Sequence, residues 1–424
     1  MADRQPMFAS LKLHNYRVFA AGALVSNIGG WMAIVAQDWL VLTELTDRSS
    51  SALGLVAGLQ FLPVALLAPF AGALADQVSK RKLLIITQSI AALNALVLFT
   101  LVVTGTARLW HVFVLATITG ATMAFDNPAR QAFVSEMVPL TLLPNAIGLN
   151  SASFNTARLI GPALAGLIIG AFGVAPAIAV NVASFAAVIG ALLVMRPDEL
   201  TPAPAVPRKR AVREGIAYVR RRPDIMLVMF IVFMLGTFGM NFQLTNALMA
   251  TTVFGKGAQE YGLLGSIMAV GSLSAALIAA RRTRPRLRVL LGALGGFTVF
   301  TTLLALAPTY AVYAVLLVPV GLCALTVLTS ANSMVQLAAG PEYRGRVMAL
   351  YMAIFLGGTP LGAPLIGWIG DVWGARWTLL IGAIATGITC LLAGGWLMIH
   401  DHLRVALKPA WPPRLVVRTH TVDE

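Results

Sequence analysis

Four charged residues lie inside long apolar stretches of this sequence, where a formal charge is expensive. They are Asp38, Asp126, Arg130 and Arg158. A charge at the centre of a bilayer costs about 2.5–3.5 kcal/mol on insertion scales, so such residues tend to be functional. The chemistry open to these residue types is proton exchange at a carboxyl and ion pairing between a carboxylate and a guanidinium.

The spacing of these residues suggests roles and leaves alternatives open. Asp126 and Arg130 are four residues apart and share a helix face, which fits a structural ion pair at the inner mouth or a relay of protons or substrate. Asp38 lies about 6 Å from the outer end of its stretch, so it is either an acid near the headgroups or a protonatable group on the outward path. Arg158 needs a carboxylate partner, and the sequence does not choose between Asp38 and Asp126.

Polar side chains within the apolar stretches are candidates for lining a substrate cavity. The seventh stretch is rich in Met and Phe, which suit adaptable apolar surfaces, although a stripe facing lipid is the alternative for any one of them. The cavity candidates are Gln37, Asn150, Asn155, Phe238, Asn241, Gln243, Asn246, Asn332 and Gln336.

The composition excludes a soluble domain. The chain has 424 residues, of which 58% are hydrophobic and 11% are charged, and its mean hydropathy is +0.81. A soluble domain carries about 25% charged residues. The two cysteines, Cys323 and Cys390, lie in apolar stretches and predict neither a disulfide framework nor a metal site. We find no catalytic constellation, no phosphate-binding loop and no motif for a cofactor, so an enzyme is not expected.

The apolar stretches are long enough to cross a bilayer, which takes about 20 residues each. The sequence therefore predicts an all-α membrane protein with twelve transmembrane helices. The predicted spans are 17–42, 52–74, 83–103, 110–131, 146–170, 175–195, 225–250, 260–280, 289–307, 311–335, 347–369 and 377–399.

The distribution of cations predicts the orientation of these spans. With the N-terminus inside, only Arg48, Arg108, Lys256 and Arg376 fall in outer loops, and the other loop cations are cytoplasmic. Lys and Arg accumulate on the cytoplasmic side, so we expect a multi-pass protein of the cell (inner or plasma) membrane with both termini inside. The net charge of +14 is then explained by topology and attraction to anionic lipid, and no nucleic-acid partner is expected.

One long polar stretch divides the chain. Residues 196–208 hold four prolines, and the basic segment that follows, 209–222, places Val212, Ile216 and Val219 on one helical face. This pattern predicts a short amphipathic helix on the inner membrane surface. The expected domains are a six-helix half at 1–195, a cytoplasmic linker at 196–224, and a second six-helix half with a cytoplasmic tail at 225–424.

An internal repeat supports this division. A shift of 201 residues places Gly161, Gly166 and Gly173 on Gly362, Gly367 and Gly374. Small residues let helices pack closely in lipid, so their recurrence indicates two related halves.

The loop after the second predicted span combines glycine, an acid and three cations in a short space. It contains Gly72, Asp76, Lys80, Arg81 and Lys82. This stretch resembles the signature loop of the major facilitator superfamily, whose pattern is roughly Gly-x-Leu-Ala-Asp-Arg-x-Gly-Arg-Arg-x-x-Leu. Gln77 and Ser79 depart from that pattern. The resemblance implies two six-helix halves that alternate between inward-open and outward-open states, with the acid bracing their inner ends.

Further stretches narrow the resemblance. Residues 127–132 (NPARQA) and 341–350 (PEYRGRVMAL) look like the enterobactin-exporter-like branch, which includes macrolide and multidrug exporters. Gly161, Pro162 and Gly166 resemble the fifth-helix antiporter motif, Gly-Pro-x-x-Gly-Gly, with one glycine in place of a pair. The resemblance implies a secondary transporter that exports an apolar or amphipathic small molecule, drug-like or siderophore-like, by proton antiport. The alternatives are an importer or uniporter, and a membrane sensor or scaffold. The expected partners are substrate, lipid and protons, and we expect a monomer.

Overall fold

The computed structural model describes residues 6–201, 211–282, 286–340, 342–400, 404–408 and 414–418. These residues form long helices, apart from a two-stranded antiparallel pair near the C-terminus, β1 (Arg404–Lys408) with β2 (Arg414–Arg418). Twelve helices are long and apolar enough to cross a membrane, which confirms the predicted number and fold class. Most of their ends fall within a few residues of the predicted ones, but the fourth helix continues past its predicted end at 131 as far as Met137.

Six long helices form the first group. They are α1 (His14–Trp39), α2 (Ser50–Gln77), α3 (Lys80–Val103), α4 (Leu109–Met137), α5 (Leu143–Phe172) and α6 (Val174–Val194). A π-helical segment, η2 (Leu40–Leu45), extends α1, and short 3-10 turns, η1 (Ala9–Lys12) and η3 (Pro197–Glu199), flank the group.

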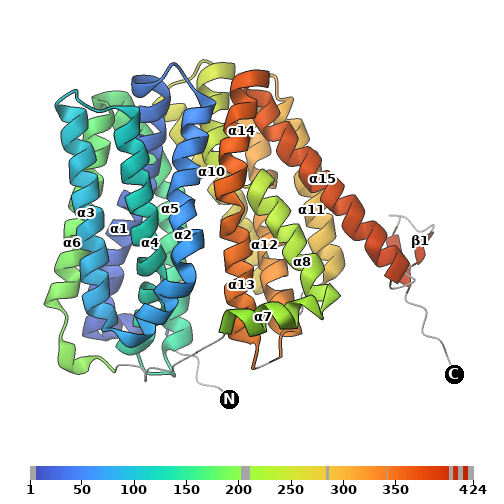
Figure 1. Ribbon diagram of the computed structural model, residues 1–424, viewed down its shortest axis with the longest axis horizontal. Helices are drawn as coiled ribbons and strands as arrows, with labels where there is room; N and C mark the ends of the chain where they lie inside the picture. Colours follow the sequence, from blue (N-terminus) through green and yellow to red (C-terminus); the bar gives the residue numbers. More distant parts are fainter. Residues whose placement is uncertain are drawn as a thin grey trace.

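The helices that follow residue 222 form the second group. They are α8 (Pro223–Met234), α9 (Phe242–Leu248), α10 (Ala258–Ala280), α11 (Leu287–Ala305), α12 (Tyr310–Ala338), α13 (Arg344–Gly357), α14 (Thr359–Trp373) and α15 (Ala375–His400). In Figure 1 the first group, from blue to green, lies beside the second, from yellow to red.

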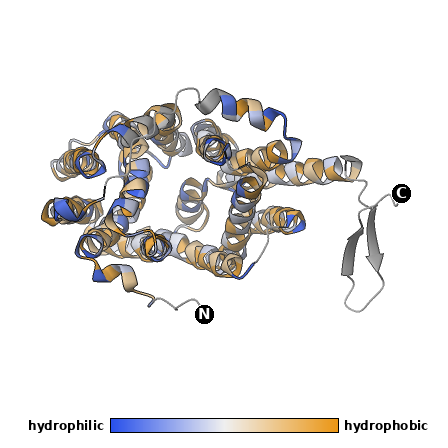
Figure 2. Cartoon of the chain, turned by 90° about the horizontal axis from the view of Figure 1, so that it is seen from below, coloured by the Kyte–Doolittle hydropathy of each residue, from blue (hydrophilic) through white to orange (hydrophobic). Residues whose placement is uncertain are grey.

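Apolar residues cover the outside of the bundle as well as its core. Figure 2 looks along the helices and shows hydrophobic residues on helices all around the outer surface. Large side chains there are open to the surroundings, as Leu391 is at 78% exposure. Water would solvate such a surface poorly, whereas lipid tails match it, so the outside of the bundle fits a membrane.

The two groups meet along two helix pairs, α2 with α14 and α5 with α10. A Cβ atom at Gly166 of α5 would fall against the backbone oxygen of Ala258 in α10. A Cβ atom at Gly367 of α14 would fall against the backbone oxygen of Ser50 in α2. These repeat-related glycines therefore have equivalent roles, because each allows close backbone contact between the two groups.

The third pair of the repeat also matches in backbone geometry. Gly173 ends α5 with φ of 84°, and Gly374 ends α14 with φ of 94°. A side chain is strained in this left-handed region, so glycine is the residue that lets each helix turn directly into the next. We call this end of the bundle, at the top of Figure 1, the Ser50 end. The other end, which holds the segment between the groups, is the linker end.

The segment between the groups contains the predicted short helix, α7 (Ala211–Arg220). Glu214 pairs with Arg346 at 2.7 Å, and the ring of Tyr218 stacks on that of Tyr343 with centroids 4.5 Å apart. Val219 is buried and Ile216 is exposed, while the side chain of Val212 lies outside the described part of the chain. The helix therefore packs on the start of α13 as well as presenting an apolar residue outward.

Two spans of the second group are interrupted midway. The seventh runs from α8 into a π-helical segment, η4 (Leu235–Gly239), leaves helical geometry at Met240 and Asn241, and resumes as α9 and η5 (Met249–Val253). The eleventh is divided at Gly358, ahead of Pro360 in the first turn of α14. Proline lacks the backbone N–H that a continuous helix would use, which favours an interruption there.

Candidate substrate cavity and coupling residues

Two adjoining cavities lie within the bundle, and they share Trp31, Ile34, Phe61, Phe154 and Gln243. The central cavity, of about 390 Å³, is lined by residues of both groups. The side cavity, of about 440 Å³, is lined by the first group together with Gln243. Cavities of this size accept drug-sized molecules. Because both groups line the central cavity, a movement of one group relative to the other would change its shape.

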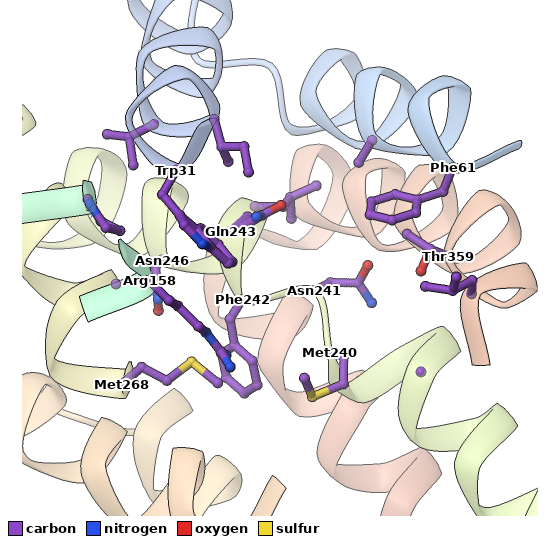
Figure 3. A pocket seen from close by; sticks show the side chains of 18 of the residues that line it. Trp31, Phe61, Arg158, Met240, Asn241, Phe242, Gln243, Asn246, Met268 and Thr359 are labelled. Carbon is purple, nitrogen blue, oxygen red and sulfur yellow. The ribbon is translucent and has the colours of Figure 1, made fainter. Parts of the chain in front are cut away.

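The helix interruptions place residues around the central cavity (Figure 3). Met240, Asn241 and Phe242 come from the break in the seventh span, and Phe355 and Thr359 flank the break in the eleventh. Where a helix departs from regular geometry, its backbone and side chains can face the interior of the bundle. Ligands are commonly bound at such interruptions in membrane helices.

Aromatic rings form one wall of the central cavity. The rings of Trp31 and Phe154 meet edge to face with centroids 5.9 Å apart. The guanidinium of Arg158 lies over the Trp31 ring, 5.8 Å from its centroid. Trp31 itself packs against Gly161, where a Cβ would fall against the Trp31 side chain. The glycine of the antiporter-like stretch thus lets α1 approach α5 and positions this wall.

The carboxylate partner expected for Arg158 is not found. Among the residues that the structure describes, no carboxylate oxygen lies within 4.0 Å of its guanidinium. Asp126 pairs with Arg130 instead, and Asp38 bonds to Tyr261. The sequence analysis considered only acidic residues as partners for Arg158. In the structure the ring of Trp31 contacts the guanidinium instead.

Asp126 is fully engaged at the side cavity. Its Oδ1 accepts hydrogen bonds from Thr87 Oγ1 at 2.8 Å and Gln88 Nε2 at 2.7 Å. Its Oδ2 contacts Arg130 through Nε at 3.2 Å and an Nη at 3.1 Å. The four-residue spacing on α4 produced the expected ion pair, and α3 supplies the two additional donors. Because both oxygens are occupied, this geometry favours the structural role for Asp126.

Asp38 makes a contact that crosses between the groups. Tyr261 of α10 donates its hydroxyl to Oδ2 of Asp38 at 2.8 Å, and both residues are buried. The Tyr261 ring stacks on Trp39 with centroids 6.4 Å apart. Tyr261 lines the central cavity, so the carboxyl lies directly behind the cavity wall. Tyr261 was not among the predicted residues, because nothing in its local sequence marks it.

The predicted cavity residues divide into two sets. Gln37 lines the side cavity, Asn241 and Asn246 line the central one, and Gln243 lines both. The others line neither cavity: they are Asn150, Asn155, Phe238, Asn332 and Gln336. Within this set, Gln336 Nε2 donates to Asn332 Oδ1 at 2.9 Å, and Asn155 Nδ2 donates to the backbone oxygen of Ser151 at 2.8 Å.

The cations of the signature loop bind within the first group. Lys80 forms a buried ion pair with Glu136 of α4, Nζ to Oε1 at 3.2 Å. Arg81 donates to the backbone oxygens of Leu192 and Leu193 at the end of α6. The backbone of Asp76 belongs to α2, but its side chain lies outside the described residues, as do its contacts. Gly72 has open space at its Cβ position, and Lys82, in the first turn of α3, donates its backbone N–H to Oγ of Ser79.

We expect Lys80→Met to lower the free energy of unfolding by about 3–5 kcal/mol, because it leaves the buried Glu136 carboxylate without its cation. Denaturant titration in detergent micelles measures this change. The double variant Lys80→Met with Glu136→Met removes both charges and should recover most of the loss. A single variant as stable as the unmodified protein would contradict a structural role for this pair.

A second bond between the groups lies at the Ser50 end and was not predicted. Asp371 of α14 accepts from the backbone N–H groups of Ser50 at 2.6 Å and Ser51 at 2.9 Å, and from Ser49 Oγ at 3.1 Å. The first N–H groups of a helix have no partners within it and carry partial positive charge. Asp371 therefore caps α2 from the opposite group. The three serines indicate the start of a helix, but nothing in the neighbouring sequence indicates that Asp371 is the partner.

A family model described as "Transmembrane secretion effector" matches residues 5–419. The chain belongs to this family of major facilitator transporters. It is a multi-pass membrane transporter of small molecules and not an enzyme. The recognised superfamily and its efflux branch are thereby confirmed.

Curated relatives of this family member resemble it over most of its length at low identity. The staphyloferrin A transporter of Staphylococcus aureus is 25% identical over 87% of this chain and 93% of the relative. The multidrug efflux pump Tap of Mycolicibacterium fortuitum is 27% identical over 91% and 96%. Macrolide efflux protein A of Streptococcus pyogenes is 25% identical over 89% and 95%.

Solved structures show the same fold. A bacterial homologue of the human lysosomal transporter Spinster, in an inward-facing and unoccupied conformation, superposes with a TM-score of 0.73 at 13% identity. The match covers 91% of this chain and 96% of the other. The nucleoside transporter NupG superposes with a TM-score of 0.67 at 13% identity, over 90% and 98%.

Proposed function

We propose that this transporter exports an apolar or amphipathic small molecule by alternating access, in exchange for protons. The observation that carries the proposal is the central cavity, which is mostly apolar and is lined by both groups of helices. The backbone contacts of α2 with α14 and of α5 with α10 close the Ser50 end. Rocking of the groups about this cavity would expose it to each side in turn.

The division into halves belongs to this proposal. Residues 1–195 and 225–424 act as the two rocking units, and 196–224 joins them. The contacts that must break during rocking lie between the units, and they include the glycine-mediated backbone contacts, the Asp38–Tyr261 bond and the Asp371 cap. All of them join the first group to the second, which supports the movement of each group as a unit.

Export is supported by the charge distribution and by the names of the relatives. The cation asymmetry favours a cytoplasmic linker end, and with that orientation the contacts at the Ser50 end close the outside. The relatives include proteins named as efflux pumps for multiple drugs and for macrolides. An apolar cavity that accepts its ligand from the cytoplasmic side fits that activity.

Proton exchange is assigned to Asp38 as the first candidate. Asp126 is held by three neighbouring side chains, whereas the Asp38 carboxyl bonds to one side chain among the described residues, Tyr261, which belongs to the other half. A change of protonation at Asp38 would therefore act directly on a contact between the halves. This arrangement links the charge state of one carboxyl to the state of the transporter.

The test of the proposed function is a substrate screen with purified protein in vesicles that carry an imposed pH gradient. We expect uphill movement of an amphipathic compound that stops when a protonophore collapses the gradient. Transport with no gradient dependence would contradict proton exchange. A complete lack of transport for all compounds in a broad panel would favour a sensor or scaffold.

We expect a cysteine at Thr201 to resist a membrane-impermeant thiol reagent in intact cells, because the linker end is assigned to the cytoplasm. Thr201 is exposed, so a cysteine there is reactive once the membrane is opened. The background is a chain with Cys323 and Cys390 replaced by serine. Thr106→Cys, exposed at the Ser50 end, is the matched control and should react in intact cells. The reverse pattern would invert the orientation.

A further inference from the structure

The central cavity contains one formal charge. Its lining is apolar and aromatic except for a few polar groups. Among the described residues that line it, Arg158 is the only one with a formal charge, and the only other ionisable group is the Tyr261 hydroxyl. That hydroxyl is already bonded to Asp38, and Asp38 itself does not line the cavity. The space therefore presents an uncompensated positive charge to whatever enters it.

The contacts of Arg158 leave the N–H donors of its guanidinium without acceptors among the described residues. The guanidinium contacts the face of Trp31, and no hydrogen bond or ion pair involves it among the residues described. A ring face attracts a cation but accepts none of its five N–H groups in the way that a carboxylate does. In Figure 3 the side chain of Arg158 reaches into the cavity beside Trp31, Phe242 and Met268.

A second donor faces the cavity from the other half. Tyr313 donates its hydroxyl to Oδ1 of Asn246 at 2.8 Å, which fixes the amide so that its NH2 group remains as a donor. Asn246 lines the same cavity as Arg158, and it belongs to α9 whereas Arg158 belongs to α5. Two sets of donors, one from each half, thus surround a space with no carboxylate in its described lining.

We propose that the central cavity selects amphipathic organic anions, with Arg158 and the Asn246 amide binding the anionic group and the aromatic wall binding the apolar body. This proposal rests on the proposed function and names the substrate class of the same site. A carboxylate, sulfonate or phosphate group supplies the acceptors that Arg158 lacks. The rings of Trp31, Phe154 and Phe61 supply a surface for the apolar part.

The energetic argument favours an anion over a cation or a neutral compound. The Arg158 guanidinium is half-buried in the cavity wall and has no anionic partner among the described residues. The charge of a substrate offsets this positive charge only when its sign is negative. A cationic compound would instead place a second positive charge beside Arg158 in a cavity of low polarity. The site therefore discriminates by charge, whereas its apolar wall tolerates many shapes.

The test uses three ligands that share one naphthylpropyl body and end in a carboxylate, a hydroxyl or an ammonium group. Binding is measured by calorimetry with the full-length protein in nanodiscs of zwitterionic lipid, and heats from empty nanodiscs are subtracted. We expect the carboxylate to bind about tenfold more tightly than the alcohol, because a hydrogen bond to a charged group is worth roughly that much. The ammonium ligand should bind most weakly.

Substitutions assign the preference to the cavity. Arg158→Gln should remove the difference in affinity between the carboxylate and the alcohol, and Arg158→Lys should keep part of that difference. Arg220→Gln, an exposed position on α7, removes the same charge elsewhere and should change nothing. Asn246→Leu should reduce the carboxylate preference without reversing it.

Two kinds of failure are distinguishable in this experiment. Equal or tighter binding of the ammonium ligand, a preference that survives Arg158→Gln, or no binding of any ligand would overturn the anion site and leave transport open. A preference that behaves as expected, with no gradient-driven flux of the bound carboxylate in vesicles, would uphold the site and count against the proposed exporter.

Discussion

Asp38→Asn is expected to reduce pH-gradient-driven export to the level of vesicles without protein. The asparagine oxygen can still accept the Tyr261 hydroxyl, which now lies 2.8 Å from the carboxylate, so the contact between α1 and α10 is retained. What the variant loses is the ability to gain and release a proton. Coupling needs a group whose protonation differs between the two states, and an amide cannot provide one.

The measurement is substrate flux in vesicles under an imposed pH gradient, together with substrate affinity at several pH values. Affinity should survive in Asp38→Asn, but its dependence on pH should flatten. Tyr261→Phe removes the hydrogen bond and keeps the carboxyl, so the charge of Asp38 no longer acts on the contact with α10. Gradient dependence should weaken in this variant, whereas the dependence of affinity on pH should remain. Export that persists in Asp38→Asn and disappears in Asp126→Asn would move the coupling role to α4.

Asp371→Ala is expected to shift the transporter toward the state that is open at the Ser50 end. The variant removes both oxygens that cap the N-terminus of α2 from α14, and leaves the N–H groups of Ser50 and Ser51 without those acceptors. Hydrogen bonds to a charged group contribute about 1.5–3 kcal/mol. A loss of that size changes the ratio of the two states by about 10- to 150-fold.

Spin labels placed across the junction report this shift. One pair, at Thr106 and Pro308, spans the Ser50 end, and a second pair, at Thr141 and Leu337, spans the linker end; all four positions are exposed. In Asp371→Ala the first distance should lengthen and the second should shorten.

Glu260→Gln serves as the control, because this acid caps its own helix through the N–H of Gly257 and makes no bond of that kind to the other group. Its distance distributions should match those of the unmodified protein. Unchanged distances in Asp371→Ala would show that the cap does not bias the equilibrium between states.

The sequence alone determined the features that depend on local pattern. Continuous apolar stretches predicted the twelve spans, since each span must satisfy its own backbone in lipid. Spacing of four residues predicted the pairing of Asp126 with Arg130, because helical geometry places those side chains on one face. The 201-residue glycine repeat anticipated Gly166 and Gly367, which do equivalent work at the two junctions.

Only the tertiary structure decided the contacts between residues far apart in the chain. Tyr261 meets Asp38 across 223 positions, and Asp371 meets Ser50 across 321. Arg158 faces Trp31 and the cavity in place of an acid. A buried polar group needs a partner, but helix periodicity fixes only the face on which that group lies. The choice of partner depends on which helices the bundle brings together, and no short stretch of sequence contains that information.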